Sequence, residues 1–379
     1  MKKSSANTKA GSISEILRRE IVSGKFDSDG RLPSEHQLMR RFSVARETVR
    51  GALKELSDRE IVDRRPGYGT FLANRASRLA SQSFGVIVPD ACYAFYAKIC
   101  DGIDACARRH GYTTFTAELG SGTMHERAIR AVKFAETCRR RNVSGVFLEP
   151  VQFLVKAEEF NRALLSVFED TDMPVVLIDS DYVQPPSRSG CDLVGIDNTN
   201  AGYRLACHLI ERGARRIVYF SNPRPAPSSI RRGSGVGFAV AEAGLPWSSA
   251  SIVFGEPDDL DVVRGVFRPG TRPDAVVAVN DYVAERLVES LAAIGLRVPD
   301  DVMVAGVNGD DSSALMNPPL TTMVQPCREI GETAVEMMFL RLADQKMAPR
   351  ETLLMPELVV RESTGGFRKS AAKRKAGGK

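Results

Sequence analysis

The sequence has few of the residues that mark disulfide scaffolds and metal sites. Its 379 residues include seven cysteines, four histidines and one tryptophan, and no two cysteines have Cys-x-x-Cys spacing. The odd count and the apolar surroundings of several cysteines predict the reduced, buried thiols of a cytoplasmic protein. The histidines are scattered, so the sequence predicts no metal site and no other cofactor.

Long apolar runs are missing as well. No stretch of eighteen apolar residues occurs, and residues 1–12 lack the apolar core of a signal peptide. Hydrophobic residues make up 43% of the chain and charged residues 26%, which is typical of a globular protein. We therefore predict a cytoplasmic protein without membrane contact. Its length predicts two or three domains.

Three motifs that carry chemistry in doubly wound enzymes are also missing. The sequence has no Gly-x-Gly-x-x-Gly after the first strand expected beyond residue 83, no Gly-Lys-Ser/Thr phosphate loop and no Gly-x-Ser-x-Gly elbow. The glycine-rich run at 233–237 has the wrong spacing for a phosphate loop and is expected to open a helix. We predict that the chain is not an enzyme, although sheets of this kind also host dehydrogenases and kinases.

The charge that is present is unevenly distributed. The formal net charge is +5, but residues 1–75 carry +6 and residues 368–379 carry another +6, which leaves −7 for residues 76–367. A basic head suits contact with DNA phosphates, whereas an acidic body does not. We predict that the basic segment 368–379 is a disordered, solubilising tail.

Two short amphipathic helices joined by a tight turn are predicted near the amino terminus. Ser34 can cap the first helix, with Gln37 as its capping-box partner. The second helix turns three apolar residues inward and presents Arg46, Thr48 and Arg50 on its opposite face. A recognition helix places the residues that meet the major groove at this position, near its start.

A basic hairpin is predicted after these helices. Ile-Val at 61–62 and Thr-Phe at 70–71 predict strands, and the glycines between them permit a tight turn beside two arginines. Helices and hairpin together predict a winged helix-turn-helix. The candidate DNA-contacting residues lie on the helices, the turn and the hairpin; they are Ser34, Glu35, His36, Ala45, Arg46, Thr48, Arg50, Arg65, Gly67 and Tyr68.

This region resembles the DNA-binding head of the GntR family of bacterial transcription regulators. Three elements carry the resemblance in the right order: Leu-Pro-Ser-Glu at 32–35, Arg-x-Thr-Val-Arg at 46–50 and Gly-x-Gly-Thr-Phe at 67–71. Three linked elements are more specific than a single helix-turn-helix pattern. The resemblance implies that the head, residues 1–75, binds operator double-stranded DNA.

Beyond a linker at residues 76–83, the pattern changes to alternating strands and helices. Unbroken apolar strands between helices predict parallel sheets that are covered on both faces. The predicted strands are 86–88, 146–148, 175–178, 217–220, 275–279 and 303–307, and the predicted helices include 96–110, 126–141, 200–212 and 281–294. Residues 84–367 are long enough for two such lobes, so we expect an α/β fold.

Carboxylates and amides follow the predicted strands. Examples are Asp90, Glu149, Asp179, Asn280 and Asp281. In open parallel sheets, ligands bind outside the carboxyl ends of the strands. Carboxylate and amide groups suit a ligand rich in hydroxyls, each of which donates and accepts hydrogen bonds. A single residue of this kind could equally cap a helix, but the whole set favours a polar cleft.

Residues 84–364 resemble the effector domain of the LacI/galactose-repressor family, which is itself similar to periplasmic sugar-binding proteins. The matching segments include 85–90, 194–198, 211–217, 295–300, 317–322 and 357–363. The resemblance implies a two-lobed, periplasmic-binding-protein-like domain with a dimer contact. A GntR-type head on a LacI-type body resembles the arabinose repressors of the GntR class, which implies a repressor controlled by a small sugar.

The resemblance implies effector contacts from both lobes. It assigns Asp281 to the family's ligand-contacting aspartate and Asp179 to a carboxylate on the facing lobe. The family's clamping arginine falls on Arg232 when counted from the preceding strand, or on Ser234 when counted back from the following Gly-Phe pair. We favour Arg232, with Arg231 as a possible substitute. The candidate set is Asp90, Phe95, Tyr96, Glu149, Asp179, Arg232, Asn280 and Asp281.

The aromatic ring that relatives often stack on a sugar is missing from its usual place. Residues 255–257, Gly-Glu-Pro, occupy that position, so stacking must come from Phe95, Tyr96 or Tyr282. The effector is expected to be a sugar; a nucleoside-responsive regulator and a solute-binding sensor are the alternatives. One head covers only a half-site, so we expect a homodimer on a two-fold symmetric operator.

Overall fold

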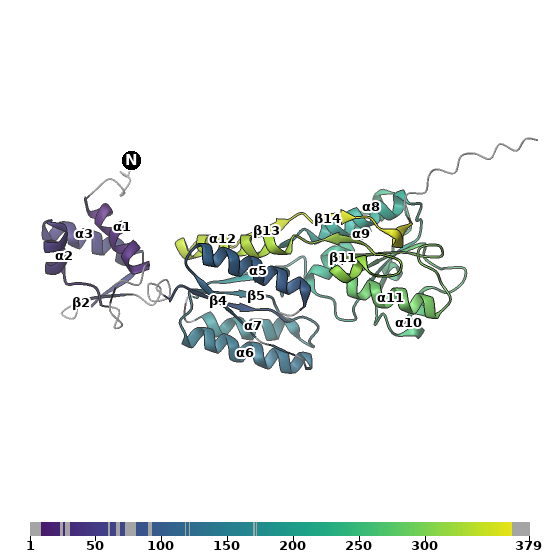
Figure 1. The fold of residues 1–379 in the computed structure, drawn as a ribbon, viewed down its shortest axis with the longest axis horizontal. Coiled ribbons are helices and arrows are strands. Elements are labelled where there is room, and N and C mark those ends of the chain that lie inside the picture. The colour runs from purple at the N-terminus through teal and green to yellow at the C-terminus, as the bar shows by residue number, and fades with distance from the viewer. Residues whose placement is uncertain are drawn as a thin grey trace, which may run out of the picture.

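The structure, a computed structural model, describes residues 9–22, 26, 31–59, 61–65, 69–72, 81–89, 93–117, 119–120, 122–169, 171 and 173–365. In this part of the chain the elements form a small head and a two-lobed body (Figure 1). The expectations for Gly67, Tyr68, Asp90 and the tail 368–379 fall outside these residues. Most of the predicted linker, residues 76–83, also falls outside the described residues. Strand β3 (Ser83–Ile87) begins at the last residue of this predicted linker.

The head has helices α1 (Lys9–Val22), α2 (Glu35–Phe42) and α3 (Arg46–Asp58), followed by the strands β1 (Val62–Arg65) and β2 (Gly69–Leu72). The predicted capping box at the start of α2 is present. The Gln37 N–H donates to Ser34 Oγ at 3.3 Å, and the Ser34 N–H donates to Gln37 Oε1 at 2.8 Å. Strands β1 and β2 pair antiparallel, which confirms the predicted hairpin.

Helix α1, which no sequence pattern above predicts, completes the core of the head. Its residues Ile13, Leu17 and Ile21 are buried and share one apolar cluster with Val49 and Leu53 of α3. Isolated helices as short as α2 and α3 are marginal in water, so their stability comes from packing of this kind.

The amino-terminal lobe has a six-stranded sheet with the order β13-β7-β6-β5-β3-β4, in which all neighbours are parallel. Helices α5 and α12 cover one face of the sheet and α6 and α7 cover the other (Figure 1). Besides β3, its elements are α5 (Ala94–Arg109), β4 (Thr113–Thr116), α6 (Met124–Arg140), β5 (Gly145–Leu148), α7 (Ala157–Glu169), β6 (Val175–Ile178), β7 (Asp192–Ile196), α12 (Cys327–Ala343) and β13 (Glu351–Leu354).

The carboxy-terminal lobe has a second six-stranded sheet with the order β14-β12-β11-β10-β8-β9, parallel except for β14. Its helices are α8 (Asn198–Glu211), α9 (Pro227–Glu242), α10 (Leu260–Val266) and α11 (Asp281–Ala293). Its strands are β8 (Ile217–Ser221), β9 (Ile252–Phe254), β10 (Ala275–Ala278), β11 (Met303–Asn308), β12 (Thr321–Val324) and β14 (Glu357–Val359). Short 3₁₀ turns are η2 (Ser249–Ser251), η3 (Asp311–Ala314) and η4 (Glu362–Thr364). The described helices include none long and apolar enough to cross a membrane.

The chain passes between the lobes at three places: from β7 to α8, from β12 to α12 and from β13 to β14. Each lobe is therefore assembled from segments that are distant in the sequence. The two sheets, parallel apart from β14, confirm the α/β class and the two-lobed body, and they place strand ends from both lobes beside one cavity.

The glycine-rich run at 233–237 lies in the middle of α9 and does not open it, which corrects the prediction. Helix α9 starts at Pro227 and packs closely on α8. A Cβ on Gly235 would collide with the Thr199 carbonyl oxygen of α8, and a Cβ on Gly202 of α8 would collide with the Arg232 carbonyl oxygen of α9. These glycines serve close helix packing.

Candidate DNA-binding and effector-binding sites

The start of α3 presents the predicted DNA-contacting arginines to solvent. The side chains of Arg46 and Arg50 are 69% and 51% exposed, and Thr48 between them is partly buried. Ala45 is the N-cap residue of α3 and provides no side-chain cap. Ser34 and His36 are exposed near the start of α2. Arg65 ends β1, and its side chain lies outside the described set.

Glu35 connects the two helices to the wing. Its carboxylate accepts a hydrogen bond from Arg46 Nε at 3.0 Å and another from Arg64 Nη2 at 2.8 Å, and Arg50 Nε lies 3.9 Å away. Exposed ion pairs contribute little to stability. The contacts of Glu35 nevertheless hold the arginines of α3 near the wing, which is the hairpin of β1 and β2. Glu35 therefore orients the predicted DNA-binding surface.

A cavity of about 660 Å³ lies between the two lobes of the body. Six of the predicted effector-binding residues line it: Phe95, Tyr96, Glu149, Asp179, Arg232 and Asn280. Lining residues outside the predicted set include Tyr93, Arg127, Gln152, Asn222, Asn308 and Gln325. Asn222 and Asn308 lie at strand ends, a position that could have identified them. Gln152 and Arg127 come from a loop and from α6, and no local motif marks them.

Asp179 has a backbone conformation that residues with side chains rarely adopt. Its φ is +65°, and the Ser180 N–H donates to the Ile178 carbonyl at 2.7 Å, which closes a tight γ-turn after β6. A Cβ on Gly195 of the adjacent β7 would lie 2.7 Å from the Asp179 carbonyl oxygen, so the turn requires glycine there. Such strain costs on the order of 1–3 kcal/mol and is concentrated at binding sites.

Several enclosed polar atoms of the cavity lining have no hydrogen-bond partner within the described ranges. They are Arg127 Nε, Glu149 Oε2, Gln152 Nε2, Asp179 Oδ1, Arg232 Nε and Gln325 Oε1. A buried polar atom without a partner costs about 1–3 kcal/mol, and folded proteins contain few of them. Donors and acceptors from both lobes converge here, so the cavity suits a polar ligand.

Arg232 and Arg231 have different surroundings, although they are neighbours on α9. Arg232 is 4% exposed; its Nη1 donates to the Val279 carbonyl and its Nη2 donates to Asn198 Oδ1 at 2.6 Å. Arg231 forms an ion pair with Glu351 at 2.8 Å. Of the two arginines, only Arg232 lines the cavity.

The two cavity carboxyls of the amino-terminal lobe are hard to ionise. Burial raises the pKa of Glu149 well above its ordinary value, the nearby Asp179 raises it further, and a hydrogen bond from Tyr96 acts in the opposite direction. Burial also raises the pKa of Asp179, and the charge of Arg232 partly offsets that rise. Tyr96 donates to Glu149 Oε1 at 2.8 Å, which leaves Oε2 unpaired.

Asp281 is not among the lining residues of the cavity, and its role as an effector contact stays a prediction. The residue is 2% exposed, and its Oδ1 accepts from the Thr322 hydroxyl at 2.6 Å. Its Oδ2 accepts from the N–H groups of Gly309 and Asp310 at 3.0 and 2.9 Å. Each carboxylate oxygen therefore accepts at least one hydrogen bond from within the protein. Asp281 anchors the loop after β11, whereas its neighbour Asn280 lines the cavity.

Aromatic rings are available to the ligand at both lobes. Tyr96 contacts Tyr93 and Phe95, with ring centroids 5.9 and 5.0 Å apart. Tyr282 also lines the cavity, as does Phe153, which the sequence did not point to. Residues 255–257, which occupy the position of the stacking ring in relatives, are not among the described lining residues. Trp247 lies in a separate apolar groove with Phe238 and Phe254.

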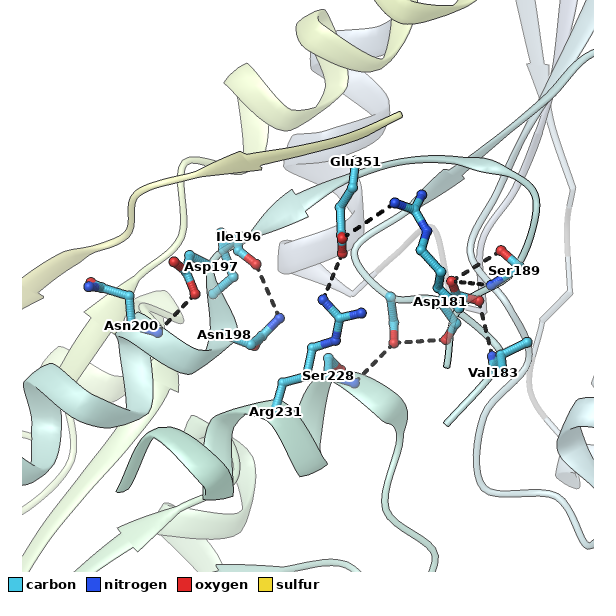
Figure 2. A network of polar contacts seen from close by, with 12 residues as sticks. Asp181, Val183, Ser189, Ile196, Asp197, Asn198, Asn200, Ser228, Arg231 and Glu351 are labelled. Carbon is cyan, nitrogen blue, oxygen red and sulfur yellow. Dashed lines mark hydrogen bonds and ion pairs between the residues drawn. The ribbon is translucent and has the colours of Figure 1, made fainter. Parts of the chain in front are cut away.

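Two groups of polar contacts connect the lobes. Figure 2 shows Glu351 of β13 paired with Arg231 of α9. The Ser228 N–H donates to Ser180 Oγ at 3.3 Å. Elsewhere, the Tyr93 hydroxyl donates to Asp310, and Lys98 Nζ lies 2.9 Å from the carboxylate of Asp311. Asp310 lies in the loop that Asp281 anchors, and Asp311 follows directly. The position of this loop therefore depends on Asp281 and affects the contact between the lobes.

Comparison with known proteins agrees with this two-part architecture. Residues 9–72 match the family "Bacterial regulatory proteins, gntR family", and residues 206–364 match the "Periplasmic binding protein-like domain". The chain is 26% identical over 355 residues to an arabinose metabolism transcriptional repressor of Geobacillus stearothermophilus, covering 91% of this chain and 94% of that protein. It is 28% identical over 289 residues to the HTH-type transcriptional repressor PurR of Aliivibrio fischeri, covering 75% and 81%.

A solved structure supports the same conclusion. A LacI family transcriptional regulator from Mycobacterium smegmatis superposes with a TM-score of 0.62 at 26% identity, covering 74% of this chain and 98% of that one. Fold, site and comparisons define a DNA-binding transcription regulator with a periplasmic-binding-protein-like effector domain. The chain combines a GntR-type DNA-binding domain with a periplasmic-binding-protein-like effector domain, and its relatives include repressors of arabinose metabolism and of the PurR type.

Proposed function

We propose that this regulator is a cytoplasmic, homodimeric repressor whose operator binding is controlled by a small sugar or sugar-like metabolite. In this proposal the head, residues 1–75, contacts one operator half-site, and residues 76–83 join it to the body. Residues 84–367 hold the effector and the dimer contact, and residues 368–379 form a basic tail. The proposal assigns no catalytic step to the chain.

One observation carries the proposal: the cavity between the lobes is lined from both sides by polar atoms that have no hydrogen-bond partner among the described residues. Glu149 and Asp179 come from one lobe and Arg232 from the other, while Gln325 follows β12 where the chain crosses between them. A ligand that contacts both lobes has different interactions in open and closed arrangements. Only such a difference lets a ligand shift the equilibrium that the heads sense. A relative named for arabinose metabolism supports a sugar as the ligand.

A thermal-shift screen should identify the effector. Each true ligand, at a hundred times its dissociation constant, should add about 2.7 kcal/mol to the free energy of unfolding of the body. The panel contains pentoses, hexoses, sugar acids and nucleosides, and each hit is tested for its effect on operator binding. A nucleoside hit would favour the alternative regulator class. A ligand that stabilises the chain but leaves operator binding unchanged would favour a solute-binding sensor.

The full-length chain should sediment as a dimer at micromolar concentration. A single recognition helix in one groove gives modest specificity, and a closed two-fold dimer presents two heads to two half-sites. Sedimentation velocity of the chain, with and without an operator duplex, measures the assembly directly. A monomer under both conditions would contradict the dimer part of the proposal while leaving effector binding open to its own test.

A further inference from the structure

Five arginines gather at the end of the body where the chain arrives from the head. They are Arg108 and Arg109 in the last turn of α5, Arg139 and Arg140 in the last turn of α6, and Arg141 directly after it. We call these five residues the basic pole. The two segments that contain them, 105–113 and 137–145, include no acidic residue. Residues 76–367 carry a net charge of −7, so the basic pole is a local reversal of charge on an acidic body.

Backbone hydrogen bonds place both helix ends beside the point where the head joins the body. The Thr113 N–H, at the start of β4, donates to the Gln82 carbonyl at 2.8 Å. The Ser144 N–H, just before β5, donates to the Ser83 carbonyl at 2.8 Å. Strands β4 and β5 both pair parallel with β3, so the three strands begin at one edge of the sheet. The basic pole therefore flanks the first residues of β3.

The arginines of the basic pole are exposed. The side chains of Arg108 and Arg109 are 68% and 59% exposed, and the three arginines at the end of α6 are exposed as well. Arg108 pairs with Asp104 one turn earlier in α5, and Arg109 lies 3.5 Å from Glu332. Exposed ion pairs of this kind are weak, so these guanidinium groups can exchange them for a more strongly charged partner.

Stabilisation of helix ends does not account for the basic pole. The helix dipole favours a basic residue in the last turn of any helix. Helices α7, α9 and α11 nevertheless have none there. Helix α12 has Arg341, but this side chain is largely buried in an ion pair with Asp192. Pairs of exposed arginines in the last turn are thus a feature of the two helices beside the head.

The spacing of the two domains along the chain keeps DNA near the basic pole. Residues 73–80 separate Leu72 of the head from Ser81 of the body. A chain extends by at most about 3.6 Å per residue, so Leu72 and Ser81 lie within about 32 Å of each other. Duplex DNA carries one negative charge per about 1.7 Å of its axis and continues beyond the half-site that one head covers. A duplex held by the head therefore presents a dense row of phosphates to this end of the body.

We propose that the basic pole is a second DNA-contacting surface, whose arginines bind phosphates of the duplex that the head holds. This contact rests on the proposed function, because it concerns how the regulator engages its operator. A guanidinium binds a phosphate through two parallel N–H donors, and phosphate contacts carry no direct sequence information. The head therefore reads the sequence, while the basic pole adds affinity and fixes the orientation of the body on the duplex.

The salt dependence of DNA binding tests this contact on the full-length chain. Fluorescence anisotropy gives the Kd at several salt concentrations for an operator selected from a random pool and for a scrambled duplex of equal length. Each phosphate contact adds about 0.9 to the steepness with which log affinity falls against log salt concentration. Replacing the three arginines of α6 by glutamine should lower this steepness by at least about 1.8 per chain, which corresponds to two lost contacts. Both duplexes should lose affinity by the same factor. The variant is Arg139→Gln, Arg140→Gln and Arg141→Gln combined.

Matched variants separate a phosphate contact from a structural effect. The same three positions changed to lysine keep their charge and should retain the wild-type steepness to within about one contact. A second triple variant removes three exposed arginines that precede β8 and β10, at the edge of the other sheet that faces away from the cavity. It should leave the steepness unchanged, although the net charge changes equally. This control is Arg215→Gln, Arg216→Gln and Arg268→Gln.

The double variant Arg108→Gln and Arg109→Gln repeats the test on α5, and it decides the outcome if the α6 variant does not fold. Wild-type steepness in the folded glutamine variants would overturn the proposal and leave the basic pole to an acidic protein partner. An equal loss in the lysine variant or in the control would overturn it as well, because the effect would then not depend on charge at this place.

Failure of this contact can be distinguished from failure of the proposed function. If the chain prefers no duplex from the random pool over the scrambled one, sequence-specific regulation fails, yet the scrambled duplex still reports the contribution of the basic pole. If the chain binds an operator in an effector-dependent way and the glutamine variants keep the wild-type steepness, the function stands and only the second contact is wrong.

Discussion

Operator binding should be largely lost when Arg46 and Arg50 are both replaced by alanine. Each arginine can make bidentate hydrogen bonds to guanine or phosphate, worth roughly 1–3 kcal/mol of specific affinity, and alanine can make neither. Both side chains project from the exposed start of α3. The double change should therefore cost roughly 2–6 kcal/mol if the two effects add.

Fluorescence anisotropy measures this loss with a duplex selected from a random pool by the wild-type chain. Arg59→Ala is the matched control, because Arg59 lies just after the end of α3, where it pairs with Glu55. A small loss for Arg59→Ala beside a large loss for the double variant would identify the start of α3 as the recognition surface. Unchanged operator affinity in the double variant would refute that assignment.

Asp281→Ala should destabilise the body by roughly 2–4 kcal/mol, because a buried donor left without an acceptor costs about 1–3 kcal/mol. The change removes the acceptor of the Thr322 hydroxyl and of two backbone N–H groups, at Gly309 and Asp310. It should also weaken the response to effector, since Asp310 and Asp311 contact the other lobe. Urea unfolding measures the loss. Asp261→Ala is the control, because that carboxylate is 94% exposed.

The same residue should make stability depend on pH. Burial raises the pKa of Asp281 to about 6, above its ordinary value of 3.8, so the folded chain holds this proton more tightly than the unfolded chain. The resulting stabilisation is fully present below the ordinary pKa and is lost as pH rises through about 6. Relative to Asp281→Asn, the wild-type chain should lose up to about 3 kcal/mol over this range. A difference that is constant between pH 5 and 7 would contradict this role.

Local sequence patterns predicted the elements whose signals are strong. The capping box at Ser34, the hairpin after α3 and the apolar strands β5, β6, β8, β10 and β11 agree with the structure, because period and capping are local properties. Strand β4 was missed because Thr113–Thr116 is polar and lies at a sheet edge. Helix α9 was misjudged because glycine lowers helix propensity, whereas close packing on α8 requires it.

The sequence alone determined the type of protein: a winged head with arginines at the start of its recognition helix, a linker, and two parallel α/β lobes with polar strand ends. Only the tertiary structure decided which strand-end residues meet the cavity. Asn280 and Asp281 are adjacent in sequence, yet Asn280 lines the cavity, whereas Asp281 accepts hydrogen bonds from Thr322, Gly309 and Asp310. Those partners come from segments about thirty to forty residues away, and the hydrogen bonding of a buried carboxyl depends on such long-range contacts. No local sequence pattern predicts these contacts.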